Sequence, residues 1–146
     1  MTLKELSQLY HLNREIDLGY RIIEELRAKA ENLSQSLSDM PSAPSKENRL
    51  ERYVAEIADL SAILDAKEVQ CIHERSRLLR WINDIDDSLT RQIFTLRFVN
   101  GCNWVQVAAS ISDSYTDGYV KNLCYRFLKE SERRKESGGI TECSGS

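Results

Sequence analysis

Apolar residues in the first part of the chain recur at alternating spacings of three and four, the period of one helix face. Thr2 and Glu5 form a T-x-x-E capping box, which marks a helix start. One long helix is predicted to run from there to about Ser38. Gly19 occupies one position of its seam, and the other positions are Leu12, Ile16, Ile23, Leu26, Ala30, Leu33 and Leu37.

A loop at about residues 39–45 should end this helix, because Pro41 and Pro44 lack an amide donor and disfavour helix in the preceding residue. A second long helix is predicted from about Lys46 to Asp86. A complete heptad row runs along it through Leu50, Ile57, Leu64, Cys71, Leu78 and Ile85. The companion row holds Val54, Leu60 and Ile82 and becomes polar at Lys67, Glu74 and Arg75.

A single exposed helix of this length would be marginal in water, so the two seams are predicted to pack as an antiparallel coiled-coil hairpin. A two-helix hairpin leaves part of each seam exposed. We therefore expect the arm either to form a homodimer with a second copy or to pack against the carboxy-terminal helices. The aspartates Asp84, Asp86 and Asp87 are interpreted as a helix break followed by an N-terminal cap.

The pattern changes after Ser88 to three shorter helices. The first is predicted from Leu89 to Val99 and ends at Asn100-Gly101, since glycine adopts the left-handed conformation that closes helices. The second begins with an N-x-x-Q capping box at Asn103 and buries Trp104, Val107, Ala108 and Ile111. After a polar turn at 112–114, the third begins at Ser114 or Thr116 and buries Val120, Leu123, Cys124, Phe127 and Leu128.

The predicted fold class is therefore all-α, with a helical hairpin at 1–87 and a three-helix, helix-turn-helix module at 88–135. A glycine-rich polar tail at 136–146 is expected to be disordered. Charge follows this division, because residues 1–88 carry a net charge of −5 and residues 89–135 carry +4. An acidic arm on a basic module is typical of a protein that binds double-stranded DNA through the module.

The exposed face of the last predicted helix supplies the candidate DNA-binding residues. Asparagine can pair with adenine and arginine with guanine in the major groove, while lysine suits phosphate. The candidates are Tyr119, Lys121, Asn122, Tyr125, Arg126, Lys129 and Arg133.

The segment from Leu89 to Lys129 resembles region four of sigma-70-type factors, and in particular the small sigma-like regulators encoded by phages and prophages of Gram-positive bacteria. The resemblance rests on Arg91 to Phe98, Gly101, Trp104 to Ala108, Ile111, and Val120 to Leu123 with Arg126 and Leu128. It extends by pattern to about residues 2–130, because those regulators carry a helical hairpin with a proline-containing loop. It implies regulation of phage transcription, with DNA and host RNA polymerase as partners.

Three features depart from that family pattern. The stretch from Ile111 to Val120 is two residues longer, Ser112 replaces the expected turn glycine, and the last helix begins Asp117-Gly118-Tyr119. The alternative function is therefore an adaptor that docks on polymerase or another phage protein without reading DNA. A small terminase subunit fits less well, because those proteins usually carry their DNA-binding helices at the amino end.

An enzyme is not expected, since no nucleophile–base pair, metal-ligand spacing or phosphate loop can be assembled. The cysteines Cys71, Cys102, Cys124 and Cys143 are far apart and predict reduced thiols without metal. No cofactor is expected. The chain lacks an apolar run of the roughly 20 residues that cross a bilayer, and its charged amino terminus is unlike a signal peptide, so a cytoplasmic location is predicted.

Overall fold

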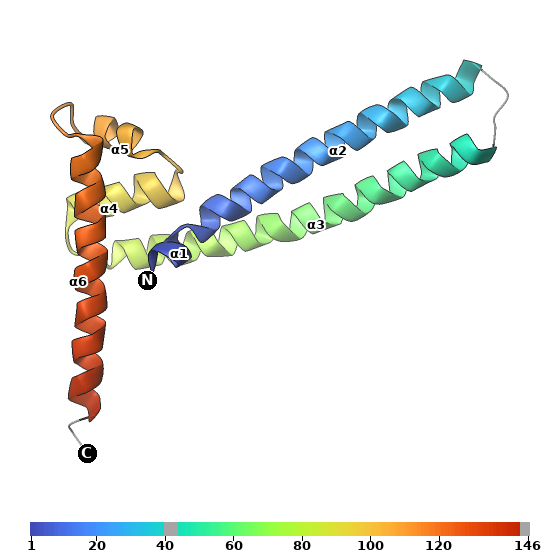
Figure 1. The fold of residues 1–146 in the computed structure, drawn as a ribbon. Coiled ribbons are helices and arrows are strands. Elements are labelled where there is room, and N and C mark those ends of the chain that lie inside the picture. Colours follow the sequence, from blue (N-terminus) through green and yellow to red (C-terminus); the bar gives the residue numbers. More distant parts are fainter. Residues whose placement is uncertain (40–43, 144–146) are drawn as a thin grey trace. The chain divides into compact units, whose positions relative to one another are not determined.

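The structure, a computed structural model, describes residues 1–39 and 44–143, with side chains for 1–36 and 47–138. Every regular element in this part of the chain is a helix, so the all-α prediction is confirmed (Figure 1). The elements are α1 (Leu3–Leu6), α2 (Gln8–Asp39), α3 (Pro44–Asn83), α4 (Ser88–Phe94), the π-helix η1 (Thr95–Val99), α5 (Trp104–Ile111) and α6 (Asp117–Cys143).

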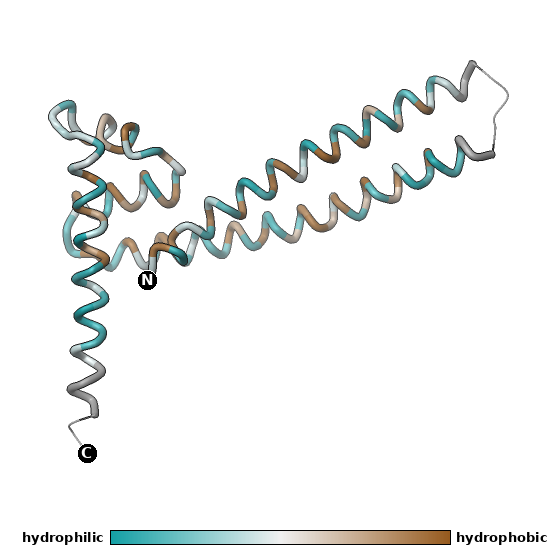
Figure 2. The backbone as a smooth tube through the Cα atoms, viewed as in Figure 1, coloured by the Kyte–Doolittle hydropathy of each residue, from teal (hydrophilic) through white to brown (hydrophobic). Residues whose placement is uncertain are grey.

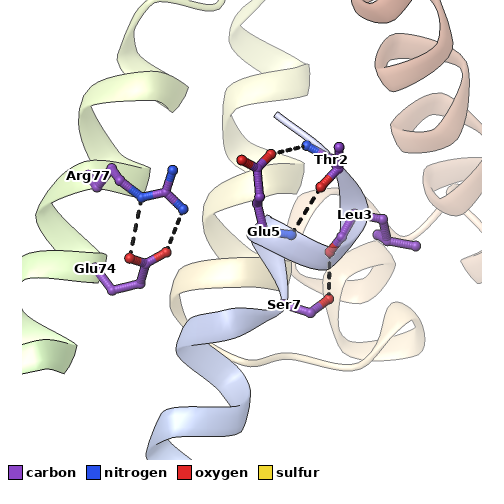
Figure 3. Close-up of polar contacts among 6 residues, drawn as sticks. All are labelled: Thr2, Leu3, Glu5, Ser7, Glu74 and Arg77. Carbon is purple, nitrogen blue, oxygen red and sulfur yellow. Dashed lines mark hydrogen bonds and ion pairs between the residues drawn. The ribbon is translucent and has the colours of Figure 1, made fainter. Parts of the chain in front are cut away.

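The predicted capping box starts the chain. The Thr2 N–H donates to Glu5 Oε2 at 2.6 Å, and the Glu5 N–H donates to Thr2 Oγ1 at 3.2 Å (Figure 3). Hydrogen bonds from the backbone and side chain of Thr2 to the ionised carboxyl lower the pKa of Glu5. The first helix is not continuous as predicted, because the chain turns at Ser7 between α1 and α2, where the Ser7 hydroxyl donates to the Leu3 carbonyl at 2.9 Å.

The chain forms two compact units, one of His11–Ile72 and one of Met1–Tyr10 together with the chain from His73 onwards. The division between the units falls inside the two long helices, whereas the sequence suggested a boundary between Asp87 and Ser88. Leu6 of α1 and Leu78 of α3 are fully buried, and both belong to the unit that contains α4 to α6, so this unit includes part of the predicted hairpin.

In the unit of 11–72 the two long helices pack together around Ile16, Ile23 and Leu64. Lys67 Nζ lies 3.4 Å from Glu15 Oε2, and Gly19 lies against Leu64, so α2 and α3 run in opposite directions. A Cβ atom on Gly19 would stand 2.5 Å from Leu64 Cδ2, so any other residue there would require the Leu64 side chain to move. Figure 2 shows hydrophobic positions recurring between hydrophilic ones along both helices.

The predicted heptad row of α3 is buried unevenly. Leu64 and Leu78 are buried, Leu50, Ile57 and Cys71 are half-buried, and Val54 of the companion row is 56% exposed. Ile85 is buried as well, but it lies beyond the end of α3. Leu37 of the α2 seam is among the residues whose side chains are not described.

The bounds of α3 differ from the prediction at both ends. The helix begins at Pro44 rather than Lys46, because proline is tolerated in the first turn, where no amide donor is needed. It ends at Asn83 rather than Asp86. Arg91 Nη1 donates to the carbonyls of Ile85 and Asp86 at 2.6 and 3.0 Å and so holds the following loop. Residues 40–43 of the predicted loop lie outside the described part of the chain.

An aromatic cluster organises the other unit. The ring of Phe94 lies 5.4 Å from Trp81, 5.5 Å from Phe127 and 5.4 Å from Phe98, measured between centroids. The contacts of Phe94 with Trp81 and Phe127 are edge-to-face, and such contacts contribute about 1 kcal/mol each beyond the area they bury. The cluster joins the end of α3, α4, η1 and α6, and thereby fixes where α6 stands on the α4–η1 segment.

The helix predicted at Leu89–Val99 changes its hydrogen-bond register midway. It runs as the α-helix α4 to Phe94 and then as η1, which the Asn100 N–H closes by donating to the Thr95 carbonyl at 3.0 Å. The wider turn places both Phe98 and Val99 among the buried residues. Gly101 has φ = 72°, as its predicted role in ending this helix requires.

Helix α6 is longer than expected. The tail was predicted to be disordered from Glu136, but α6 continues to Cys143. The Ser137 hydroxyl also donates to the Arg134 carbonyl at 3.2 Å. Residues 144–146 lie outside the described part. No helix in the described part is both long and apolar enough to span a membrane.

Candidate nucleic-acid interface

Two well-defined helix starts place α5 and α6. The Gln106 N–H donates to Asn103 Oδ1 at 2.8 Å and the Asn103 N–H donates to Gln106 Oε1 at 2.9 Å, so the predicted capping box of α5 is confirmed. The sequence left Ser114 and Thr116 open as caps of α6. The structure selects Thr116, whose hydroxyl accepts a hydrogen bond from the Tyr119 N–H at 3.2 Å.

The turn between these helices is built by serines. Ser112 Oγ accepts from the Ser114 N–H at 3.3 Å, and the Ser112 carbonyl accepts from the Tyr115 N–H at 3.1 Å. Ser112 itself has φ = −162°, which is extended backbone that any residue can adopt. The turn therefore needs no glycine at Ser112, which accounts physically for the second of the departures from the family pattern.

A small apolar core fixes α6 on α5. Val107, Ala108, Val120 and Cys124 are all buried, as the sequence predicted for both helices. Burial raises the pKa of the Cys124 thiol to about 12, so this cysteine is a neutral packing residue. Leu128 is buried further along α6, and Leu123 and Phe127 are half-buried. The predicted apolar face of α6 is thus confirmed, and its opposite face is turned to solvent.

The exposed face of α6 carries the predicted contact residues. All seven are exposed: Tyr119, Lys121, Asn122, Tyr125, Arg126, Lys129 and Arg133. Asn122, Arg126, Lys129 and Arg133 follow one another at spacings of four, three and four, which aligns them in one stripe. None of these four side chains has a hydrogen bond or ion pair to any residue that the structure describes.

We call these four residues the α6 stripe. Its polar groups keep all of their donors available for an external acceptor such as a phosphate or a base edge. Three glutamates flank it, because Glu130 follows Arg126 by four positions, Glu132 follows Lys129 by three and Glu136 follows Arg133 by three. The stripe is therefore a row of three cations and one amide about three helical turns long, bordered by carboxylates.

Lys121 lies at the edge of this surface and belongs to a row of stacked groups. Its Nζ lies 5.9 Å from the centroid of the Tyr125 ring, and Tyr125 lies 6.3 Å from Trp104 at an angle of 60°. Arg97 Cζ lies 4.8 Å from the centroid of the Trp104 ring, and Arg97 Nη1 donates to the Cys102 carbonyl at 3.0 Å. The row connects η1, α5 and α6 with a cation at each end, and it holds Tyr125 in place.

Sequence reasoning assigned Tyr125 to the site but missed Arg97 and Tyr115. The Tyr115 and Tyr119 rings lie 5.0 Å apart and form a tyrosine pair at the amino end of α6. The spacing of four between the two tyrosines could have indicated this contact. Nothing in the sequence pattern indicated Arg97, because its contact with Trp104 depends on how η1 and α5 are connected.

The third departure from the family pattern is the start of the last helix at Asp117. A carboxylate at the start of a DNA-contacting helix would repel phosphate. Asp117 is the first residue of α6, where a negative charge suits the helix dipole. At 3.6 residues per turn it points about 140° away from Asn122. The carboxylate is therefore on a different side of α6 from the stripe.

Comparison with family models, with curated proteins and with solved structures finds no match to this chain. Among the side chains that the structure describes, no three of the types that hold metal ions in proteins lie together. DNA binding therefore stays a prediction, which rests on the family resemblance and on the exposed residues of α6.

Proposed function

We propose that this protein is a DNA-binding transcriptional regulator of phage or prophage genes, in which α4 to α6 form a sigma-region-four-like helix-turn-helix. In this proposal α6 lies in the major groove of double-stranded DNA, with α5 crossing behind it. The observation that carries the proposal is the α6 stripe, a row of one amide and three cations without partners in the described structure.

The chemistry of the stripe fits the two tasks of such a helix. Asn122 and Arg126 stand one turn apart near the amino end, where a recognition helix reads base edges. Lys129 and Arg133 extend the row toward the carboxy end and suit phosphates of the DNA backbone. The hydrogen-bonded turn at Ser112 and the burial of Ala108 on α5 and of Val120 on α6 support a fixed angle between the two helices.

Host RNA polymerase is a further proposed partner, on the resemblance alone. The arm of α2 and α3 would then serve as a coiled-coil spacer. No enzymatic activity and no cofactor belong to the proposal.

The test is binding of fluorescent duplexes by the purified full chain, with a phage late-promoter sequence and its scrambled counterpart at several salt concentrations. We expect a promoter preference that persists near physiological salt. Weak binding of both duplexes that vanishes steeply with salt would contradict base reading and favour the protein-docking adaptor.

The double variant Asn122→Ala and Arg126→Ala should lose this preference, with promoter affinity falling at least about tenfold, since each good base contact contributes roughly 1–3 kcal/mol of discrimination. Arg134→Ala is the matched control, because it removes an arginine from the same helix about 120° from the centre of the stripe. Helicity measured by circular dichroism should be equal in all three proteins. Unchanged promoter affinity in the double variant would overturn the assignment of α6.

A further inference from the structure

One face of the arm, which residues 11–72 form, carries large apolar side chains that are about half exposed to solvent. Leu18 and Ile22 of α2 are each 47% exposed, and Ile63 of α3 is 52% exposed. A large apolar side chain in water forfeits most of the stabilisation that its burial would contribute, about 25 cal/mol for each Å². We call these three residues the arm patch.

The arm patch lies on a single face, as the ion pair between the helices demonstrates. Leu18 and Ile22 follow Glu15 by three and seven positions, so they share its side of α2. Ile63 precedes Lys67 by four positions, so it shares the side of Lys67 on α3. Because Glu15 and Lys67 are 3.4 Å apart, all three residues of the patch line the same edge of the hairpin.

The opposite edge is polar on α2. Tyr20 donates a hydrogen bond to Glu68 there, which marks that edge on both helices. Ile72 follows Glu68 by four positions and is 64% exposed. Its neighbours from α2 on that edge are Asn13 and Asp17, which are exposed and polar. The exposed apolar neighbour of Ile72, Val69 three positions earlier, also belongs to α3, whereas the arm patch contains residues of both helices.

The register of the two helices makes the patch complementary to itself. Gly19 lies against Leu64, so in this antiparallel pair Ile63 is level with Tyr20, midway between Leu18 and Ile22. A two-fold axis parallel to the helices leaves the position of each residue along the helices unchanged. It would set α2 of one copy against α3 of the other. Ile63 of each copy then enters the gap between Leu18 and Ile22 of the other, which is knobs-into-holes packing.

The ion pair on the same face fits this arrangement. Glu15 of one copy comes level with Lys67 of the other, so the existing ion pair becomes a network of four groups. A two-fold axis perpendicular to the helices would instead set Glu15 against Glu25, which are like charges.

We propose that the protein is a homodimer that pairs through the arm patch, with the two-fold axis running along α2 and α3, so that the arms form a four-helix bundle. This inference is independent of the proposed DNA binding, since no residue of α5 or α6 takes part. It identifies a second copy of this chain as the partner of the arm and gives the face and the relative direction of the helices.

The experiment is sedimentation equilibrium of the full chain without DNA. We expect a dimer for the native protein and a dissociation constant raised at least about tenfold by Ile63→Glu, which would place a carboxylate among apolar side chains. Ile72→Glu is the matched control, being the same change at an exposed isoleucine of the same helix, and should leave the dimer intact. A native protein that stays monomeric at all concentrations, or equal weakening by both variants, would overturn the proposal.

A charge exchange tests the direction of the axis. Glu15→Lys and Lys67→Glu should each weaken the dimer, and their combination should restore it, because the opposite charges again meet across the interface. Thermal unfolding followed by circular dichroism confirms that each variant is folded. A combined variant as weak as the single ones would overturn the proposed axis.

Discussion

Individual residues set the ends of the helices and hold the loops between them. Gly101 ends a helix at φ = 72°, and Asn103 caps the next one. Arg91 has a role that the family resemblance did not specify, since it holds two carbonyls of the loop after α3. These are local interactions, so the residue types and their spacing were sufficient to predict the first two.

Gly101→Ala tests the left-handed residue. Alanine at a positive φ is strained by about 1 kcal/mol, and no neighbouring atom is close enough to contribute a clash, so the free energy of unfolding should fall by about that amount. Urea unfolding measures it. Gly118→Ala is the control, because its Cβ would also meet open space but inside α6, where alanine favours helix. Equal effects of both changes would contradict the backbone explanation.

At the scale of elements, the helix starts marked by capping residues were predicted correctly, whereas the change of hydrogen-bond register inside one helix was not. Asp87 is the N-cap of α4, where its Oδ2 accepts hydrogen bonds from the Thr90 hydroxyl at 2.6 Å and the Thr90 N–H at 2.9 Å. The conversion of the same segment into η1 after Phe94 was not predicted. Insertion of a π-turn depends on how Phe94 and Phe98 reach the aromatic cluster, which the helical period alone does not encode.

The cap of α4 predicts a pH dependence. The hydrogen bonds from Thr90 lower the pKa of the Asp87 carboxyl below its ordinary value. A carboxyl with a lowered folded-state pKa contributes stability that is present above about pH 4 and is lost as pH falls through the folded pKa.

The difference in unfolding free energy between the native protein and Asp87→Ser should therefore shrink from about pH 6 to about pH 3. Serine is the matched substitution, because it caps helices without titrating. Parallel curves for the two proteins would refute this origin.

For the whole molecule, the proposed regulator combines a paired arm with an α6 that binds DNA. Charge is divided accordingly, with −5 over residues 1–88 and +4 over residues 89–135. So small a positive charge implies that the electrostatic part of DNA affinity comes from a few specific cations rather than from the whole surface.

The salt dependence of DNA binding tests this distribution. Each phosphate contact adds about 0.9 to the slope of log affinity against log salt. Removing Lys129 and Arg133 together, each to glutamine, should therefore make the slope shallower by about 2, while the preference for promoter over scrambled duplex is kept. The control is Arg134→Gln with Lys135→Gln, which removes two cations of α6 outside the stripe. A slope reduced equally in both double variants would indicate a diffuse electrostatic surface.

The sequence by itself determined the all-helical class, the helix starts at Thr2, Asp87 and Asn103, and the division of α6 into an apolar and a polar face. Each depends on neighbours within a few turns, whose spacing is written in the chain. The sequence also gave the reason for expecting DNA, through its resemblance to sigma region four, and that assignment stays a prediction.

Tertiary structure alone decided which distant residues meet. The Phe94 cluster, the row from Arg97 through Trp104 to Tyr125, and the level of Gly19 against Leu64 join residues from separate elements. It also decided that α1, the first residues of α2 and the last turns of α3 belong to the unit that contains α6. Leu6 of α1 and Leu78 of α3 are buried in that unit. Periodicity tells which face of a helix is apolar, but not which element covers it. Packing is a property of several faces together, and it is fixed only when all of them are in place.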